Sequence, residues 1–137
     1  MRSELAANCM AGPHASILVV DDELDVRLTL SEVLQFEGYE VQTAGNGREA
    51  LECMERGACP AVVLLDLMMP EMNGFEFLQR VRADPRLRKT AIIVLTAFGR
   101  MAEKLEAQRL MVEDFLEKPF EFDHLLEAIG HCAENAR

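Results

Sequence analysis

Five residues of this chain have side chains that could together carry out chemistry on a phosphate group: Asp21, Asp22, Asp66, Thr96 and Lys118. They supply three carboxylates, one hydroxyl and one ammonium, each just after or near the end of a short apolar run. Two carboxylates about 4 Å apart repel each other by roughly 1 kcal/mol in water and by about 4 kcal/mol at an effective dielectric constant of about 20. Such a set favours a bound cation. Because every ligand on offer is an oxygen atom, we expect a hard ion such as Mg²⁺.

Phosphoryl transfer suits these residue types. Mg²⁺ typically uses one or two protein carboxylates together with waters and a phosphate oxygen, which leaves another carboxylate as a nucleophile. A carboxylate that attacks phosphorus forms an acyl phosphate, and it needs no general base because Asp is ionised at neutral pH. Lys118 would neutralise one phosphate oxygen as a point charge, and the Thr96 hydroxyl would donate a hydrogen bond to another.

Five short runs of mostly apolar residues predict the strands that position these side chains. They span residues 16–20, 40–44, 61–65, 91–95 and 112–116. The third and fourth runs are wholly apolar, which is typical of strands buried on both faces of a parallel sheet.

Helical periodicity between these runs predicts the helices. The apolar faces are formed by Val26, Leu30, Val33 and Leu34; by Ala50, Leu51 and Met54; by Phe75, Leu78 and Val81; and by Phe122, Leu125, Leu126, Ile129, Cys132 and Ala133. A weaker stripe at residues 100–110 predicts the remaining helix, and Asn46 with Glu49 is placed as a cap pair. Five strands alternating with five helices predict a single-domain, doubly wound α/β fold with three layers. Ligands of such folds bind beyond the carboxyl ends of the strands, where the five residues fall.

The charge of the chain argues against direct binding of nucleic acid. The formal net charge is -10, from 24 acidic and 14 basic residues. Nucleic acids bind through clustered Lys and Arg. The basic residues between Arg80 and Lys89 are interrupted by Asp84 and Pro85, and this pattern indicates a solvated helix end and loop.

The four cysteines, Cys9, Cys53, Cys59 and Cys132, show no metal-binding spacing. We interpret them as reduced thiols of a cytoplasmic protein. No apolar run approaches 18 residues, so we expect no membrane span. Residues 1–14 lack the apolar core of a signal peptide and are expected to form a flexible tail, followed by one domain at 15–137.

Four segments in order resemble the receiver domain of two-component response regulators, of which the chemotaxis response regulator is the minimal example. They are Ile17–Glu23, Val63–Gly74, Ile93–Ala97 and Asp114–Phe120. The resemblance extends over about residues 16–134, nearly the whole chain. It implies a flavodoxin-like parallel sheet with the strand order 2-1-3-4-5 and a signalling domain that catalyses only its own phosphorylation and dephosphorylation.

The resemblance also implies a role for each residue of the candidate site. Asp66 would be the phosphoacceptor. Asp22 and Asp66 would bind Mg²⁺ directly, Asp21 would act through a water molecule, and the backbone carbonyl of Met68 would be the remaining protein ligand. Lys118 would contact the phosphoryl group.

Further positions match the switch and the loops of the family. Thr96 and Ala97 would bind the phosphoryl group, and Thr96 and Phe115 would rearrange when it arrives. Pro119 matches a proline that usually follows a cis peptide bond. Gly74 matches a loop position at which glycine accepts a positive φ.

The chain departs from the family pattern before its fifth strand, where Met111 and Val112 replace the usual Gly-Ala pair. This departure concerns the conformation of the loop before that strand and not the chemistry of the site. Met68 and Phe98 occupy positions that tune the lifetime of the phosphoryl group, and two apolar side chains there would limit the access of water.

A nucleotide-binding domain is a rival interpretation. Residues 45–50 read Gly-x-Gly-x-x-Ala after a strand and at the start of a helix, with Asp66 about where a ribose-binding acid would lie. This interpretation leaves four residues unexplained: Asp21, Asp22, Thr96 and Lys118. The glycine pattern also normally follows the first strand.

An aspartate-nucleophile phosphatase and a pseudo-receiver that only binds partners are two further rival interpretations. The phosphatases usually carry an acid two residues after the nucleophile, and Met68 stands there. The pseudo-receiver is disfavoured because the acidic, threonine and lysine positions are all filled.

The resemblance implies a sensor histidine kinase or a histidine phosphotransfer protein as phosphodonor, and a downstream effector protein or domain as target. The target would bind the face formed by the fourth helix, the fifth strand and the fifth helix. Some relatives form charge-paired dimers there, but Ala128 replaces their arginine, and the last helix is acidic through Glu121, Asp123, Glu127 and Glu134. We therefore expect a different protein, or a domain beyond Arg137, to bind this face.

Overall fold

The structure is a computed structural model that describes residues 15–57, 59–67, 74–97 and 111–135. Its strands are β2 (Ser16–Val20), β3 (Glu40–Ala44), β4 (Val62–Asp66), β5 (Ala91–Ala97) and β6 (Asp114–Lys118). The helices of the described part are α1 (Leu24–Phe36), α2 (Gly47–Arg56), α3 (Gly74–Ala83) and α5 (Phe122–Asn135). The predicted helix at 100–110 and the predicted tail at 1–14 lie outside the described residues.

All five strands are parallel and lie in the order β3-β2-β4-β5-β6, which confirms the predicted 2-1-3-4-5 topology. β4 begins and ends one residue later than predicted, and β6 lies two residues later than the run at 112–116. Met111, whose φ of 60° is left-handed, directly precedes the predicted run, and the chain is still turning up to residue 113, before β6 begins.

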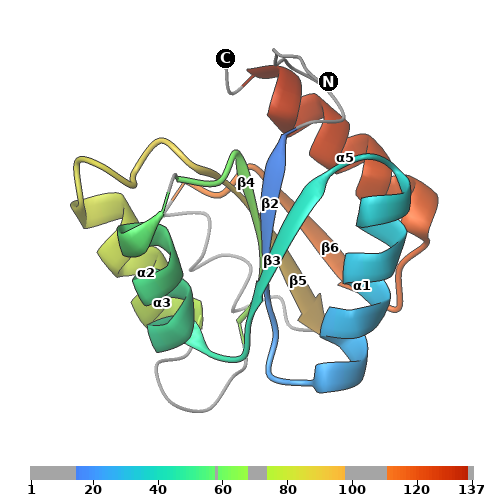
Figure 1. Ribbon diagram of the computed structural model, residues 1–137, viewed down its shortest axis with the longest axis horizontal. Coiled ribbons are helices and arrows are strands. Elements are labelled where there is room, and N and C mark those ends of the chain that lie inside the picture. Colours follow the sequence, from blue (N-terminus) through green and yellow to red (C-terminus); the bar gives the residue numbers. More distant parts are fainter. Residues whose placement is uncertain (1–14, 58, 68–73, 98–110, 136–137) are drawn as a thin grey trace.

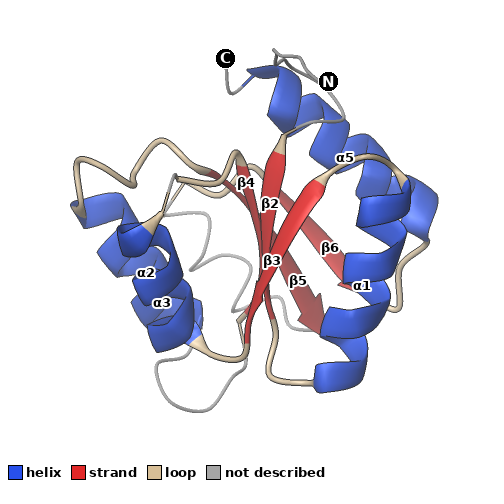
Figure 2. Cartoon of the chain, in the orientation of Figure 1, coloured by secondary structure: helices blue, strands red, loops and turns tan. Residues whose placement is uncertain are grey.

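Two helical layers enclose the sheet (Figures 1 and 2). α1 and α5 cover one face, and α2 and α3 cover the other. Alternate strand residues feed two separate cores: Val19 and Leu64 pack with α1 and α5, whereas Val20 and Leu65 pack with α2 and α3. The central strands are therefore buried on both faces, as their wholly apolar sequences predicted.

The start of α2 confirms the predicted cap pair. The Asn46 side chain accepts a 2.9 Å hydrogen bond from the Glu49 backbone N–H. Glu49 in turn reaches past the cap residue and accepts a 2.8 Å bond from the Gly45 N–H. This reciprocal arrangement satisfies backbone donors that a helix start leaves open.

The last helix buries Leu125, Ile129 and Cys132 on the predicted apolar stripe. Phe122, which we placed on the same stripe, is 40 % exposed. It opens the helix and contacts the edge of the Phe120 ring, with the ring centroids 6.5 Å apart. Within the described part of the chain, the helices are too short or too polar to cross a membrane.

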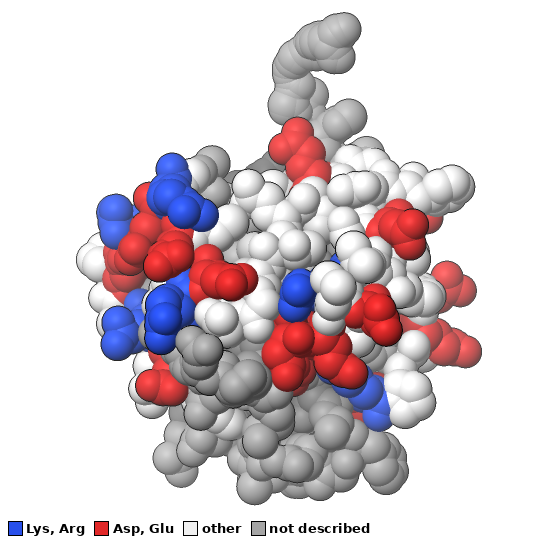
Figure 3. All heavy atoms as spheres, turned by 60° about the horizontal axis from the view of Figure 1, so that its bottom comes forward, with Lys and Arg blue, Asp and Glu red and all other residues white. Residues whose placement is uncertain are grey.

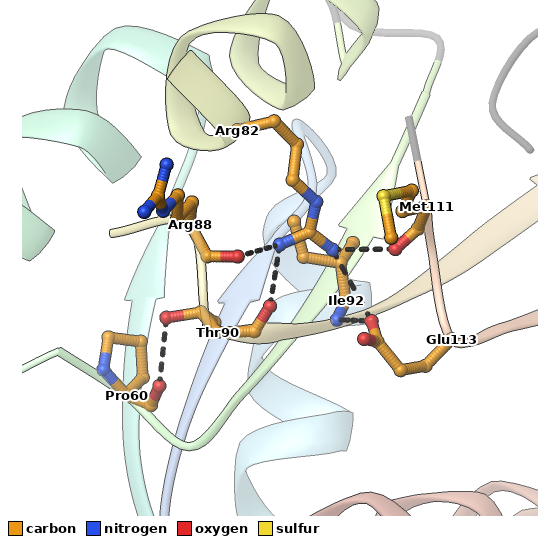
Figure 4. A network of polar contacts seen from close by, with 7 residues as sticks. All are labelled: Pro60, Arg82, Arg88, Thr90, Ile92, Met111 and Glu113. Carbon is orange, nitrogen blue, oxygen red and sulfur yellow. Dashed lines mark hydrogen bonds and ion pairs between the residues drawn. The ribbon is translucent and has the colours of Figure 1, made fainter. Parts of the chain in front are cut away.

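One of the basic residues predicted to be solvated is instead built into the fold (Figure 4). Arg82, near the end of α3, donates to the carbonyl oxygens of Arg88, Thr90 and Met111 at 2.7–2.9 Å. It also pairs with the Glu113 carboxylate at 3.4 Å, and its own side chain is only 14 % exposed. The prediction was wrong for this residue because three backbone acceptors, which leave no trace in the sequence, converge on the guanidinium.

Glu113 completes this network at the amino ends of β5 and β6. Its carboxylate accepts a 2.6 Å hydrogen bond from the Ile92 N–H, and its own N–H donates to the Ile92 carbonyl at 2.8 Å. We call Arg82, Glu113 and the carbonyls of Arg88, Thr90 and Met111 the Arg82 network. It ties α3 to the two strands that carry Thr96 and Lys118.

Candidate functional site

The topology brings the predicted site residues to one edge of the sheet. Asp21 follows β2 directly, Asp66 is the last residue of β4, and Lys118 is the last residue of β6. Because the strands are parallel, these ends share the carboxyl edge. Figure 3 shows acidic side chains gathered on the face that this edge presents.

Three carboxylates meet there. Asp21, Asp22 and Asp66 each offer an oxygen atom, and these oxygens all lie within 4.8 Å of one another. Asp21 and Asp66 are buried, with 0 % and 8 % of the residue exposed, whereas Asp22 is exposed. An all-oxygen donor set with one side open to solvent fits Mg²⁺, which binds through few carboxylates and keeps several waters.

Asp21 is held on every side by contacts within the chain. One carboxylate oxygen accepts a 2.9 Å bond from the Glu23 N–H, and the other accepts a 3.2 Å bond from Lys118 Nζ. Its N–H donates to the Ala44 carbonyl at 3.1 Å, and its carbonyl accepts a 2.7 Å bond from Arg27. The turn that carries Asp21 and Asp22 is therefore fixed from four directions.

Lys118 bridges two of the acids. Its Nζ lies 3.2 Å from a carboxylate oxygen of Asp21 and 3.6 Å from one of Asp66. Burial lowers the pKa of Lys118, but attraction to Asp66 and then Asp21 outweighs burial and raises the pKa above its usual 10.5. Because the folded-state pKa is raised, the stabilisation is fully present below pH 10.5 and is lost only as the pH rises through the higher folded-state pKa.

The peptide bond between Lys118 and Pro119 is cis. It directly follows β6, and α5 begins three residues later, at Phe122.

Gly74 does not have the positive φ that we expected. It is the first residue of α3 and lies outside the left-handed region. A Cβ atom added there would lie 2.5 Å from the Leu67 Cα and 2.9 Å from the Asp66 carbonyl oxygen. Glycine is needed for this close approach of α3 to the end of β4, and not for an unusual backbone angle.

The other predicted site residues are described only in part. Thr96 and Ala97 belong to β5, where their backbones pair with Glu117 and Lys118, so both lie at the same edge. Their side chains, and all of Met68 and Phe98, lie outside the described residues. Phe115 is half-buried and packs against the core on the α2 and α3 side.

The glycine pattern at residues 45–50 follows an edge strand. β3 pairs with β2, and β2 separates it from β4, which ends in Asp66. Asp66 instead lies with Asp21, Asp22 and Lys118. A dinucleotide interpretation would need the acid on a strand next to the glycine turn, so the topology disfavours it.

Sequence reasoning missed Arg27 as a partner of this site. The residue lies six positions after Asp21 and donates a hydrogen bond to the Asp21 carbonyl. An arginine in the first turn of a helix has no distinguishing pattern, and its acceptor is a backbone atom, so the sequence offered no signal for it.

Comparison with known proteins identifies the family. A model of the response regulator receiver domain matches residues 17–130. The chain belongs to the response regulator receiver domain family. As the resemblance predicted, this receiver domain acts in two-component phosphorelay signalling.

Two relatives illustrate the match in sequence. The receiver domain is 36 % identical over 117 residues to sporulation initiation phosphotransferase F of Bacillus subtilis, covering 85 % of this chain and 91 % of that protein. It is 38 % identical over 121 residues to response regulator Rre1 of Synechocystis, covering 88 % of this chain but 51 % of Rre1. The chain thus spans about half the length of that relative.

Solved structures share the fold. A putative response regulator from Chloroflexus aurantiacus superposes with a TM-score of 0.83 at 31 % identity, over 88 % of this chain and 98 % of the other. The receiver domain of the Francisella response regulator 1452 gives a TM-score of 0.82 at 25 % identity, over 90 % of this chain and all of that one.

Proposed function

We propose that this receiver domain accepts a phosphoryl group on Asp66 in a Mg²⁺-dependent reaction. The observation that carries the proposal is the meeting of three carboxylates within 4.8 Å of one another, with Lys118 Nζ 3.6 Å from Asp66. Membership of the receiver family supports the same role.

In the proposed reaction a carboxylate oxygen of Asp66 attacks the phosphorus of a phosphohistidine. The new P–O bond forms as the P–N bond breaks, and the imidazole leaves with the electron pair and takes a proton from solvent. Lys118 turns from the carboxylates to a phosphoryl oxygen and neutralises its charge, and the Thr96 hydroxyl and the Ala97 N–H donate to the others.

The proposed metal ligands are Asp22 and Asp66 directly, Asp21 through a water molecule, and the carbonyl of Met68. A Mg²⁺ ion held there supplies positive charge to the oxygens of the transferred group. The protein fits this role because two of its three acids are buried and fixed, while Asp22 faces solvent.

The phosphodonor, a sensor histidine kinase or a histidine phosphotransfer protein, would approach along α1. Leu24 and Leu28 lie one helical turn apart on that helix, next to the acidic turn, and are 57 % and 54 % exposed. Two exposed leucines on one face offer an apolar contact beside the acceptor.

The output face would comprise residues 98–110, β6 and α5. Arrival of the phosphoryl group would draw in Thr96 and let Phe115 pack more deeply. The charge of α5 argues against a charge-paired dimer, because Asp123 and Glu127 are exposed on it and Glu121 is exposed directly before it. We expect light scattering to show no salt-sensitive dimer with or without beryllofluoride, and such a dimer would contradict this part of the proposal.

Labelling tests the acceptor directly. A radiolabelled phosphohistidine donor or acetyl phosphate with Mg²⁺ should place base-labile phosphate on one residue, and Asp66→Asn should abolish it. Asp123→Asn, which makes the same change at an exposed site on α5, is the matched control. Labelling of Asp66→Asn at the wild-type rate would refute the proposal.

Two further variants separate the metal from the phosphate. Asp22→Ala should weaken Mg²⁺ binding first, as followed by NMR shifts in a Mg²⁺ titration. Lys118→Ala should bind Mg²⁺ with less change but lose the shifts that beryllofluoride induces in the wild type. Equal losses in both variants would contradict the assigned roles.

A further inference from the structure

Arg27 lies behind the acidic turn and connects it to the neighbouring loop. Its guanidinium donates a 2.7 Å hydrogen bond to the carbonyl of Asp21, and its backbone N–H donates to the Glu23 carbonyl at 3.1 Å. The two acceptor carbonyls belong to the residues on either side of Asp22, the exposed acid of the cluster. The side chain of Arg27 is thus directed at the backbone from which Asp22 projects.

Gly45 has no side chain, and the guanidinium of Arg27 occupies the space beside it. A Cβ added at Gly45 would lie 3.2 Å from the Arg27 guanidinium nitrogen and 3.4 Å from a Glu49 carboxylate oxygen. The guanidinium therefore lies against the turn after β3, and Glu49 fixes that turn by accepting from the Gly45 N–H at 2.8 Å. Gly45 is the first glycine of the apparent nucleotide pattern. Its lack of a side chain allows Arg27 of α1 to pack against the turn after β3.

We propose that Arg27 is a positioning residue for the metal site and raises the affinity of the acidic turn for Mg²⁺. This inference rests on the proposed function, because it requires Asp22 and Asp66 to bind the ion. Asp21 is already fixed by Lys118 and by the Glu23 N–H, but Asp22 is exposed, so the backbone of the turn directs its carboxylate. By holding the Asp21 carbonyl, Arg27 keeps that backbone in the orientation that places Asp22 near Asp66.

Positioning and charge predict opposite signs for the loss of Arg27. A guanidinium near a cation site repels the cation, so removal of its charge alone would tighten Mg²⁺ binding, and the gain would fade as salt screens the charge. Loss of a residue that orients a metal ligand instead weakens binding, typically by about 10- to 100-fold. The direct bond to the Asp21 carbonyl makes us expect the second effect to win.

Gly45 supplies a test that leaves the charge in place. Gly45→Ala forces the guanidinium to move by a few tenths of an ångström, because a 3.2 Å contact is tighter than ordinary packing. The residue is outside the left-handed region, so alanine adds no backbone strain there. Positioning by Arg27 predicts weaker Mg²⁺ binding in this variant, whereas a pure charge effect predicts no change.

The experiment is a Mg²⁺ titration of the unphosphorylated chain, followed by NMR shifts of the acidic turn at low and at high salt. We expect Arg27→Gln to bind about tenfold or more weakly at both salt concentrations. Arg27→Lys should lose part of the affinity although its charge remains, and Gly45→Ala should show a smaller loss. Arg86→Gln, which removes an exposed arginine, and Gly130→Ala, where the new Cβ meets nothing within 4 Å, are the matched controls.

Each outcome has a definite meaning. Tighter binding by Arg27→Gln at low salt, with Gly45→Ala unchanged, would overturn the positioning role. Wild-type affinity in all three variants would overturn it as well. Failure of the wild type to bind Mg²⁺ would instead refute the proposed function. Melting curves of each variant exclude a loss caused by unfolding, and the Mg²⁺ concentration that gives half-maximal Asp66 labelling should rise in parallel with the dissociation constant.

Discussion

The two edges of the sheet both carry clusters of charge, but the clusters are composed differently. At the carboxyl edge, Asp21, Asp22 and Asp66 lie close together, and the ammonium of Lys118 pairs with Asp21 and Asp66. At the amino edge, the Arg82 network sets one guanidinium against one carboxylate and three backbone carbonyls. The cluster at the carboxyl edge has an excess of negative charge, and one of its acids, Asp22, is exposed to solvent. In the Arg82 network, hydrogen-bond donors are matched to acceptors.

The difference indicates what each cluster is for. Burying carboxylates beside one another lowers stability unless a cation or another positive group binds among them. A network that satisfies strand-end carbonyls stabilises the fold and leaves nothing for a ligand. We therefore expect substitutions at the amino edge to change stability and those at the carboxyl edge to change chemistry.

Arg82→Met gives the largest expected effect on stability. The substitution removes four hydrogen bonds or ion-pair contacts from a side chain that is 14 % exposed. Three carbonyls near the strand starts lose a donor, so the free energy of unfolding should fall by about 2–4 kcal/mol. Urea denaturation measures this loss, and labelling of Asp66 should be preserved below the melting temperature.

Arg86→Met is the matched control for Arg82. Arg86 forms a surface pair with Asp84, and its side chain is 69 % exposed. Exposed pairs contribute little, so this variant should unfold with the wild type. Similar losses in both variants would contradict a special role for the Arg82 network.

Gly74→Ala should displace the backbone at the end of β4, which carries Asp66. The added Cβ would lie 2.5 Å from the Leu67 Cα and 2.9 Å from the Asp66 carbonyl oxygen, both of them backbone atoms. The chain must shift, at a cost of about 1–3 kcal/mol, and Asp66 labelling should slow because its backbone moves.

The control for this glycine is Gly130→Ala. A Cβ at Gly130, in the middle of α5, meets nothing within 4 Å. Alanine should stabilise the helix by about 0.5–1 kcal/mol and leave labelling unchanged. Equal changes in the free energy of unfolding of the two variants would contradict the conclusion that Gly74 is needed for close packing.

The sequence predicted the carboxyl edge better than the amino edge, for a physical reason. Asp21, Asp66 and Lys118 stand next to or within apolar runs, and parallel strands align their ends, so pattern and topology together indicate one location. Their chemical roles remain predictions. The Arg82 network depends on backbone acceptors, which every residue carries and no pattern distinguishes.

Glycine and methionine show the same limit. Gly74 looked like a turn residue because a sequence cannot separate a need for positive φ from a need for close approach. The apolar Val112 extended the predicted fifth strand, because periodicity does not reveal that the chain is still turning at residues 111–113. Both differences depend on backbone geometry, which the pattern of apolar residues does not report.

Asp66→Asn should raise stability when Mg²⁺ is removed. The change takes one of three carboxylates out of a cluster within 4.8 Å, which relieves like-charge repulsion, although it also removes an ion pair with Lys118. We expect a net gain of about 1 kcal/mol in urea denaturation with a chelator present. The gain should shrink at saturating Mg²⁺. A lower free energy of unfolding with and without Mg²⁺ would show that repulsion among the three carboxylates does not destabilise the fold.

Met111→Gly should stabilise the amino edge, where the Arg82 network holds the Met111 carbonyl. Met111 has a φ of 60°, which costs a side-chain-bearing residue about 1–2 kcal/mol, and its side chain is 75 % exposed and contributes little burial. Glycine removes the strain but gains more freedom in the unfolded chain, which returns about 0.5–1 kcal/mol. The net gain should therefore be roughly 0.5–1 kcal/mol in urea denaturation, and Met111→Ala, which keeps the Cβ, should show none. A gain of similar size in both variants would assign the effect to the lost side chain, and a loss in Met111→Gly would mean that the methionine is held there by contacts stronger than the strain.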